Sequence, residues 1–302
     1  MSEINISIEG GTSKRLLTAG KFCNKDIVVT AEGGGNLLKQ FIEGTLTELY
    51  DEEVESVGDY AFYYTTMPSR VELPNVRRVG AMSFCYSKQT EIVLPKLEEI
   101  GNSAFANFAA LVEVDYPLVN SISYQAFKSC ANLTKINFPL IEKISGQYAF
   151  AYCPALVDVN LPKLTEVPSY TFQKCTALTH VVLPNVTKTE NHSFIECSSL
   201  RVVDLPKATN CSGSFSKCGA LIALILRNTG KVCGTGSAAL SFSSQSPKTP
   251  IELGTGFIYV PAALLDGYKT HTYWSSLANQ FRALEDYTVD GTVTGALDES
   301  KI

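Results

Sequence analysis

The sequence lacks several features that mark common classes of protein. Lys and Arg number 25 against 30 Asp and Glu, which gives a formal net charge of −5. Broad binding to nucleic acid needs a basic surface that displaces counterions from phosphates, so this balance argues against it. No apolar run reaches the length of a membrane-spanning helix. The first residues, MSEINISIEGGTSKRLL, also lack the apolar core of a secretory signal.

Motifs of catalysis are missing as well. The chain has three histidines, His180, His192 and His271, and it has no HExxH, P-loop, CxxC pair or glycine fingerprint after a strand. A hydrolase needs a nucleophile, a base and an orienting group within hydrogen-bond reach, and a metal site needs a full set of ligands. We therefore expect no enzyme, no metal site and no cofactor. An enzyme with a site in the segment 230–250 is the weakest alternative.

What the sequence does contain is a repeat of about 22 residues. Phenylalanines recur at spacings of 21 to 23 residues, and the prolines of "LP" pairs recur in step with them. Two markers in step indicate a solenoid, in which each coil contacts only its neighbours. The phenylalanines are Phe62, Phe84, Phe105, Phe127, Phe150, Phe172, Phe194 and Phe215, and the prolines are Pro74, Pro95, Pro117, Pro139, Pro162, Pro184 and Pro206.

Each repeat has the same internal pattern. In the segment LTHVVLP, residues 178–184, apolar residues alternate with others, which is typical of a strand with one buried face. Pro184 ends this strand because proline has no N–H for the ladder. A second short extended piece follows, and then a turn that carries the phenylalanine. The pattern therefore predicts a β-rich solenoid.

Five of the nine cysteines follow the repeat. Each lies three residues after one of the phenylalanines, at a position that holds Phe108, Ser87 or Thr65 in earlier repeats. A position that accepts such different residues is a packing slot, in which free cysteine acts as a small buried hydrophobe. These cysteines are Cys130, Cys153, Cys175, Cys197 and Cys218, while Cys23, Cys85, Cys211 and Cys233 lie outside the slot and receive no role.

The repeat resembles the BspA-like leucine-rich repeats, whose unit reads roughly L-x-x-I-x-L-P-x-x-V-x-x-I-G-x-x-A-F-x-x-C. The resemblance covers about residues 54–226 and includes Ile100-Gly101 and Ala104-Phe105. It implies a non-enzymatic protein of a bacterial surface that acts in adhesion. The chain departs from the pattern in its later coils, which we expect to be less regular; the departures are Thr171, Thr189-Glu190, Ser193 and Ser214.

Three segments are expected along the chain. Residues 1–35 form an N-terminal β segment that ends in a glycine linker, and LLTAGKFCNKDIVVT within it resembles a segment of structural proteins from phages and prophages. Residues 36–253 form the leucine-rich-repeat solenoid, with a capping turn at 36–60 and an irregular end at 227–253. Residues 254–302 form a C-terminal cap and tail.

The C-terminal cap contains both strand and helix signals. The segment FIYV, residues 257–260, reads as a final strand. Apolar residues at helical spacing then predict helices over about 262–268 and 274–284. Such a cap covers the exposed edge of the last coil, and the polar residues from about 288 read as a frayed tail.

The outward residues of the strands form the first candidate binding surface. They stand two and four residues before each proline, which places them on the solvent side of the sheet. The surface is polar and mildly acidic, with two asparagines stacked on adjacent coils. Its candidate residues are Glu91, Glu113, Asp115, Lys135, Asn137, Asp158, Asn160 and His180. The alternative is that they are solvated strand residues with compensating charges.

Tyrosines form the second candidate surface. They cluster two residues before or after the repeating phenylalanines, and tyrosine combines a rigid contact area with a polar tip. The candidates are Tyr64, Tyr86, Tyr148, Tyr152 and Tyr170. The alternative is that they pad the rim of each turn.

The leading hypothesis is a non-enzymatic binding or adhesion protein at the bacterial cell surface or secreted. It would present an extended repeat surface to a protein or carbohydrate on a host or bacterial surface. One alternative is a phage or prophage structural or receptor-binding protein, located in the phage particle. A weaker alternative is a structural spacer. The ligand, the binding face and the oligomeric state stay open.

Overall fold

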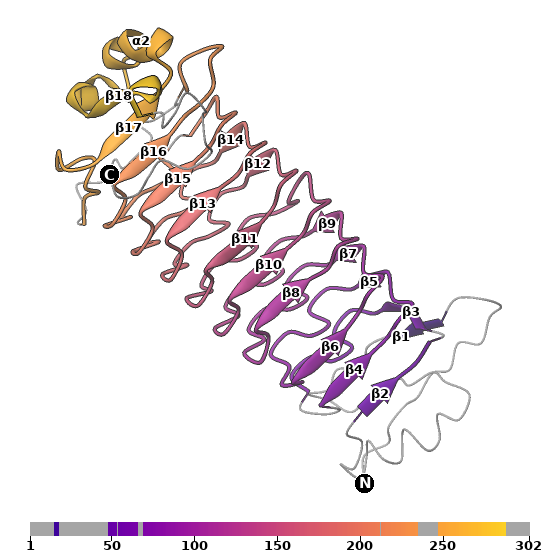
Figure 1. The fold of residues 1–302 in the computed structure, drawn as a ribbon. Helices are drawn as coiled ribbons and strands as arrows, with labels where there is room; N and C mark the ends of the chain where they lie inside the picture. The colour runs from indigo at the N-terminus through magenta and orange to yellow at the C-terminus, as the bar shows by residue number, and fades with distance from the viewer. Residues whose placement is uncertain are drawn as a thin grey trace. The chain divides into compact units, whose positions relative to one another are not determined.

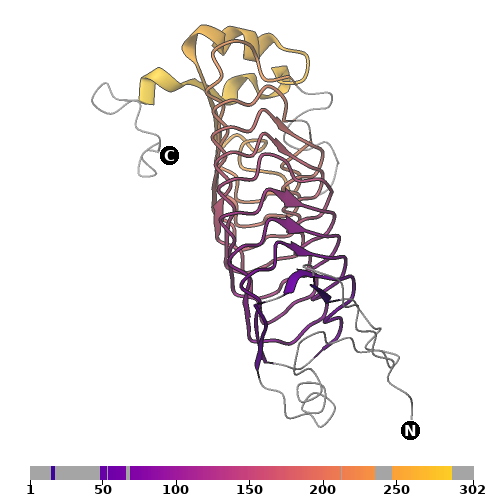
Figure 2. The same cartoon turned by 90° about the vertical axis from the view of Figure 1, so that its right-hand side faces the viewer.

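The structure is a computed structural model that describes residues 15–17, 48–52, 54–65, 69–211, 213–234 and 247–287, with only the backbone described for 15–17. Contacts divide the chain into two compact units, Met1–Cys153 and Pro154–Ile302. Each unit is a β-solenoid in which short parallel strands repeat from coil to coil (Figure 1). Figure 2 shows from another side how equivalent segments of successive coils follow one another within each unit.

The N-terminal unit contains two rows of parallel strands, one on each side of its coils. The strands that precede the prolines are β2 (Glu48–Tyr50), β4 (Arg70–Glu72), β6 (Glu91–Val93), β8 (Glu113–Asp115) and β10 (Lys135–Asn137). The second row is β1 (Arg15–Leu17), β3 (Val54–Val57), β5 (Arg78–Val79), β7 (Glu99–Ile100) and β9 (Ser121–Ile122). The register matches the repeat, since Arg70 lies opposite Glu91 and Arg78 lies opposite Glu99.

The C-terminal unit likewise contains two rows of parallel strands. Its first row is β11 (Asp158–Asn160), β13 (His180–Val182), β15 (Val202–Asp204), β16 (Ala223–Ile225), β17 (Phe257–Val260) and β18 (Phe281–Ala283). Its second row is β12 (Glu166–Val167) and β14 (Lys188–Thr189), continued by single bridges from Lys188 to Asn210 and from Asn210 to Gly234.

The parallel ladder begins earlier in the chain than the repeat itself. Strand β1, which lies in the expected N-terminal β segment, pairs with β3 and so joins a sheet of the solenoid. The rest of residues 1–35 lies outside the described residues. Glu48 of β2 lies opposite Arg70 of β4. Strands β2 and β3 therefore already follow the register of the later coils, although they fall in the segment expected to be a capping turn.

Stacked phenylalanine rings form the core of each unit. In the N-terminal unit Phe84 stacks on Phe105 and Phe105 on Phe127, with centroids 5.3 and 5.1 Å apart. In the C-terminal unit Phe172 stacks on Phe194 at 5.1 Å. All five side chains are fully buried, as the repeat predicts. Because each coil supplies one ring, the stack fixes the register between neighbouring coils.

The cysteine slot is buried as predicted, and it also has a polar role. The thiols of Cys130 and Cys197 donate to the carbonyl oxygens of Phe105 and Phe172, one coil earlier, each at 3.0 Å. Ser87 occupies the same slot and donates to Phe62 at 2.6 Å. Cys, Ser and Thr can all supply this donor, which explains why they interchange at one buried position.

Two residues with left-handed backbone flank each of the repeating phenylalanines. Around Phe127 they are Gln125 and Ser129, with φ values of 55° and 61°. Their N–H groups donate to the carbonyls of Gln147 and Ala151 on the next coil, at 3.0 and 2.8 Å. A positive φ at the third residue of a β-turn is typical of type II. These turns stack as regularly as the strands do, and we name the surface that they form the turn face.

The Ile-Gly landmark of the repeat marks a close approach between coils. A Cβ atom added to Gly101 would lie 2.7 Å from the carbonyl carbon of Gly80 and 2.9 Å from the nitrogen of Ala81. Glycine is therefore required there because the backbone of the preceding coil occupies the space of a side chain.

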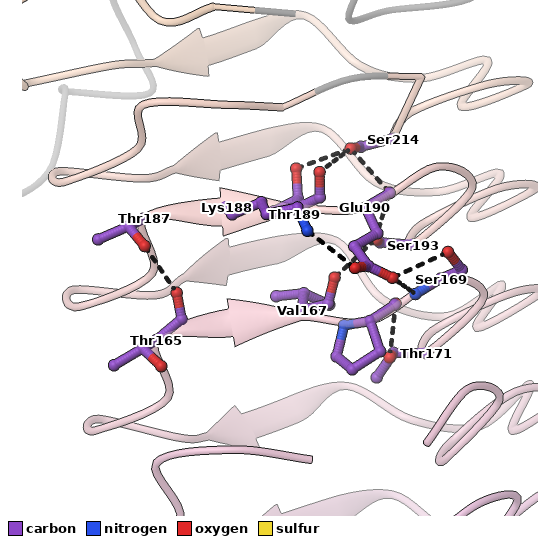
Figure 3. Close-up of polar contacts among 11 residues, drawn as sticks. Thr165, Val167, Ser169, Thr171, Thr187, Lys188, Thr189, Glu190, Ser193 and Ser214 are labelled. Carbon is purple, nitrogen blue, oxygen red and sulfur yellow. Dashed lines mark hydrogen bonds and ion pairs between the residues drawn. The ribbon is translucent and has the colours of Figure 1, made fainter. Parts of the chain in front are cut away.

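Buried hydroxyls replace alanine in the later coils, and the register survives. The hydroxyl of Ser193 donates to the carbonyl oxygen of Glu190 at 2.5 Å and lies 3.2 Å from that of Val167, and the hydroxyl of Ser214 lies 2.7 Å from that of Thr189 (Figure 3). Strands β12 and β14 still pair in parallel. The irregularity expected from these residues is absent here because each buried hydroxyl has a hydrogen-bond partner.

The C-terminal cap confirms part of the prediction and corrects part of it. The strand at 257–260 is β17, and the helix predicted over about 262–268 is present as the 3-10 turn Ala262–Leu264 followed by α2 (Leu265–Thr270). The helix predicted over 274–284 is wrong. A kinked 3-10 segment, Ser275–Gln280, leads into strand β18, which pairs with β17. Phe281 thereby packs against Tyr268 and Trp274, so tertiary packing overrides the helical spacing. Residues from 288 on lie outside the described residues.

Candidate functional site

The outward strand face of the N-terminal unit carries charges that compensate one another. Arg70 forms an ion pair with Glu91, with Nε and Oε2 3.0 Å apart. Glu113 and Lys135 lie directly opposite each other in β8 and β10 and are both exposed. Asn137 donates to the carboxylate of Asp115 at 2.7 Å. Such pairs contribute only about 0–1 kcal/mol each in water, so this face is polar and internally matched.

On the C-terminal unit the predicted residues Asp158, Asn160 and His180 are exposed on β11 and β13. Beyond β13 the expectation of a solvated face is wrong. Val202 and Asp204, in the same outward columns, are 3% and 2% exposed.

A hydrophobic cluster explains this burial. Val202 packs with Ala223, Ile225 and Tyr259, and Leu284 from the 3-10 segment Leu284–Tyr287 packs against them. The cap region therefore covers the outward face of β15 to β17, and the polar strand face ends at β13.

A buried ion pair lies beside this cluster. Both carboxylate oxygens of Asp204 accept hydrogen bonds from Arg227, at 2.8 to 3.1 Å. Burial raises the pKa of Asp204, and the guanidinium of Arg227 opposes this rise. The effect of desolvation on the pKa of Asp204 is thus larger than the effect of its pairing with Arg227. We interpret this ion pair as a structural contact.

The turn face of the N-terminal unit carries a cluster of four tyrosines. The rings of Tyr64 and Tyr86 stack with centroids 4.4 Å apart, and Tyr63 meets both edge-on at 4.6 and 6.3 Å. Tyr60 meets Tyr63 edge-on at 5.5 Å. Tyr64 and Tyr86 are 52% and 40% exposed, so the cluster presents a large aromatic surface to solvent.

A second aromatic cluster lies further along the same face of this unit. Lys128 places its ammonium 5.5 Å from the ring centre of Tyr148 and 5.7 Å from that of Tyr152. Tyr124, which is 43% exposed, meets Tyr148 edge-on at 6.1 Å. The sequence analysis predicted the tyrosines but not Lys128. The only feature of the sequence that could have indicated this residue is its position directly after Phe127.

On the C-terminal unit the turn face carries one aromatic pair. Tyr170 stacks on His192 with centroids 5.1 Å apart, and both residues have positive φ. The five predicted tyrosines therefore fall into three groups on the turn face, two on the N-terminal unit and one on the C-terminal unit.

The backbone at these tyrosines is strained. A left-handed conformation costs a non-glycine residue about 1–2 kcal/mol, whereas glycine adopts it freely. Among the described residues fifteen non-glycine residues have positive φ, and six of them are tyrosine, although the whole chain of 302 residues has 14 tyrosines. They are Tyr60, Tyr64, Tyr86, Tyr148, Tyr152 and Tyr170. The backbone conformation by itself does not favour tyrosine at these positions.

Comparison with protein families identifies the repeat. The family described as "BspA type Leucine rich repeat region" matches in six copies over residues 41–157 and 120–243, more than half of the chain. The chain belongs to the BspA-type leucine-rich repeat family. The matched range begins after the segment that resembles phage proteins, so that resemblance receives no support. No curated protein matches the chain.

Several solved structures are similar to this BspA-type chain. A leucine-rich repeat protein of T. pallidum is 29% identical, over 39% of this chain and 59% of that one, with a TM-score of 0.37. A leucine-rich cell surface protein of Faecalibacterium prausnitzii is 22% identical, over 74% and 71%, with a TM-score of 0.42. A leucine-rich repeat protein of Bacteroides ovatus is 18% identical, over 72% and 63%, with a TM-score of 0.46. The alignment thus spans less than two thirds of the first and third of these proteins.

The thiol of Cys197 in the packing slot does not suit nucleophilic chemistry. The thiol of Cys197 is fully buried, and burial raises its pKa well above the ordinary value, so it is a poor nucleophile. No group of three or more His, Cys, Asp or Glu side chains within the described ranges could hold a metal ion. In the same part of the chain no helix is both long and apolar enough to cross a membrane.

Proposed function

We propose that this chain is a non-catalytic recognition protein that binds a protein or carbohydrate partner through the turn face of its coils. The leucine-rich-repeat family supports a repeat-based binding role, because stacked coils create an extended surface. The proposed setting is the bacterial cell surface or the secreted fraction, as the family resemblance implies.

One observation carries the choice of the turn face. Tyrosines occupy positions where the backbone favours glycine, yet Tyr60, Tyr64 and Tyr86 expose 38% to 52% of their surface instead of filling the core. A large part of each ring stays in solvent, so a contact with a partner is the better account of them. Tyrosine is enriched at the centres of binding surfaces because its ring gives contact area at low entropic cost.

The strand face is the weaker candidate. Its charges are matched within the chain, as in the pair of Arg70 with Glu91 and the hydrogen bond from Asn137 to Asp115. A partner would have to compete with these contacts, and the face is closed beyond β13 by the cluster around Val202 and Tyr259. The predicted strand residues therefore stay candidates for secondary contacts.

The test is a binding assay with the full chain. Fluorescently labelled protein is applied to intact bacterial cells, to immobilised fibronectin and to mucin, with labelled albumin as control. We expect saturable retention on at least one of these surfaces. Absence of saturable binding to all three would contradict a recognition role and favour a spacer. Hydrolysis of a model ester or glycan that one point mutation abolishes would contradict the non-catalytic assignment.

A further inference from the structure

Two cysteines outside the packing slot meet at the end of the solenoid. Cys211 and Cys233 are both fully buried, and their Sγ atoms lie 3.2 Å apart. Both are free thiols. Their arrangement differs from that in the slot, where Cys197 and Cys218 point at the carbonyl oxygens of the preceding coil at 3.0 and 3.1 Å. For Cys211 and Cys233 the nearer partner of each sulfur is the other sulfur.

The backbone here brings the two cysteines onto adjacent coils. Asn210 and Gly234, the neighbours of the two cysteines, form a parallel bridge between these coils, and strands paired in this way lie about 4.8 Å apart. Cys211 follows the bridge and Cys233 precedes it, so the two residues are not directly opposite each other, and the contact between their sulfur atoms is what brings them together. The sulfurs must approach by only about 1.2 Å to reach the bond length of about 2.05 Å. We propose that Cys211 and Cys233 form a disulfide that fastens the C-terminal cap to the last regular coil.

The position of Cys233 explains what such a bond would hold. Its N–H donates to the hydroxyl oxygen of Tyr268 at 2.8 Å, and its carbonyl accepts from the indole of Trp274 at 2.8 Å. Tyr268 and Trp274 are fully buried and pack with Phe281 as the centre of the cap. Both main-chain polar groups of Cys233 therefore bind the cap, and a bond from its sulfur to Cys211 ties that anchor to the coil before it.

The chemistry requires an oxidant of the small-molecule disulfide class, such as oxidised glutathione. The thiolate of one cysteine attacks a glutathione sulfur, which forms a mixed disulfide and releases one glutathione thiolate. The thiolate of the other cysteine then displaces the second glutathione thiolate and closes the bond between Cys211 and Cys233. Two electrons pass from the cysteine pair to the oxidant, and the two cysteine protons end on two molecules of reduced glutathione.

Burial decides when this step takes place. The contact with Cys233 and the loss of water hold the pKa of the Cys211 thiol well above its ordinary value. Few thiolates form in the folded state, and the oxidant has no direct access to either sulfur. The bond therefore closes during folding or during a local opening of the last coil, and once closed it is protected from reductants.

The test is to refold the full chain with oxidised and reduced glutathione, alkylate the remaining thiols, and identify cross-linked peptides by mass spectrometry. We expect one major cross-link, between Cys211 and Cys233. Limited proteolysis then compares the oxidised and reduced chains, and we expect at least a tenfold slower release of the C-terminal cap after oxidation. Alkylation of both thiols after refolding, or a dominant cross-link between other cysteines, would overturn the proposal.

Variants separate this bond from a general effect of oxidation. Cys211→Ser and Cys233→Ser should each abolish the slower release of the cap. The matched control, Cys175→Ser with Cys197→Ser, removes two equally buried thiols from neighbouring coils and should retain it. Retention of the slower release in Cys211→Ser would contradict the proposal, as would a cross-linked wild-type chain whose cap is cleaved at the reduced rate. If a variant fails to fold, the cross-linked peptides of the wild-type chain still test the proposal.

Discussion

The thiol of Cys197 donates a hydrogen bond to the carbonyl oxygen of Phe172, one coil earlier, over 3.0 Å. The same contact recurs from Cys130 to Phe105 and, through a hydroxyl, from Ser87 to Phe62. The slot therefore couples a buried donor on one coil to the backbone of the coil before it.

Substitution of Cys197 tests this role. Cys197→Ser keeps a donor in a slot where Ser87 is buried and bonded, so we expect a small loss in the free energy of unfolding. Cys197→Val keeps an apolar side chain of similar size but removes the donor, which costs about 1 kcal/mol more. Urea denaturation of both variants provides the comparison. A valine variant as stable as the serine variant would show that the slot selects for packing alone.

The left-handed turns give a second prediction. Ser129 has a φ of 61°, and Ser129→Gly should raise the free energy of unfolding by about 0.5–1 kcal/mol, because relief of backbone strain outweighs the entropy of the unfolded chain. The matched control is Ala131→Gly, two residues on, where φ is not positive and glycine should cost about 0.5–1 kcal/mol. Equal effects of the two substitutions in urea denaturation would contradict the assignment of strain.

The close approach of neighbouring coils at Gly101 gives a third prediction. A methyl group there would meet the backbone of Gly80 at 2.7 Å, so Gly101→Ala should cost about 1–3 kcal/mol through strain. At Gly234 the nearest atom to an added Cβ is the carbonyl oxygen of Thr209 at 3.5 Å, an ordinary contact, so Gly234→Ala should change stability little. Thermal unfolding of the two variants tests this difference. The prediction fails if both variants unfold at the wild-type temperature.

The carboxylate of Glu190 gives a prediction about pH. Lys188 donates to it at 2.9 Å, and with the N–H and hydroxyl of Ser169 it holds the pKa of Glu190 below the ordinary value (Figure 3). A carboxyl whose pKa is lowered by folding stabilises the fold above its unfolded pKa of about 4.3, and this contribution is lost as the pH falls through the folded pKa.

We therefore expect Glu190→Gln to lower the free energy of unfolding at pH 7 and to have a smaller effect at pH 3. Because Glu190 is partly exposed, the difference should stay below about 1 kcal/mol. Glu48→Gln, at an exposed position of β2, is the control and should leave the profile unchanged. An equal effect of Glu190→Gln at both pH values would show that its ionisation is not linked to folding.

Periodicity explains how much of the fold could be predicted from the sequence. The stacked phenylalanines and the slot of Cys197 recur in every coil, so sequence spacing alone located them. The positive φ of Tyr64 or Lys174 has no such signature, because neither residue type favours the left-handed region by itself. There the conformation is imposed by the neighbouring coils.

Contacts between distant parts of the chain could not be predicted from the sequence either. Val202 and Asp204 are in phase with the exposed strand residues, but Leu284, some 80 residues later, packs against the cluster that contains Val202. Pairing of β18 with β17 likewise replaced a predicted helix. The same holds for the candidate site. Sequence spacing predicted its tyrosines, but it did not predict that the ammonium of Lys128 lies over the rings of Tyr148 and Tyr152.

The most direct test of the account compares the two faces of the N-terminal unit in the binding assay. The turn-face variant is Tyr64→Ser with Tyr86→Ser, because Ser129 occupies the equivalent left-handed position, two residues after its phenylalanine. The strand-face variant is Glu113→Gln with Lys135→Gln, which removes two opposed charges.

Both variants are compared with wild type on the surface that retains the wild-type chain, after circular dichroism has confirmed that they fold. We expect the turn-face variant to lose at least tenfold in apparent affinity and the strand-face variant to stay within about twofold, since a buried aromatic anchor contributes 2 kcal/mol or more and an exposed charge pair about 0–1 kcal/mol. Loss of binding in the strand-face variant, with the turn-face variant unchanged, would contradict the central claim.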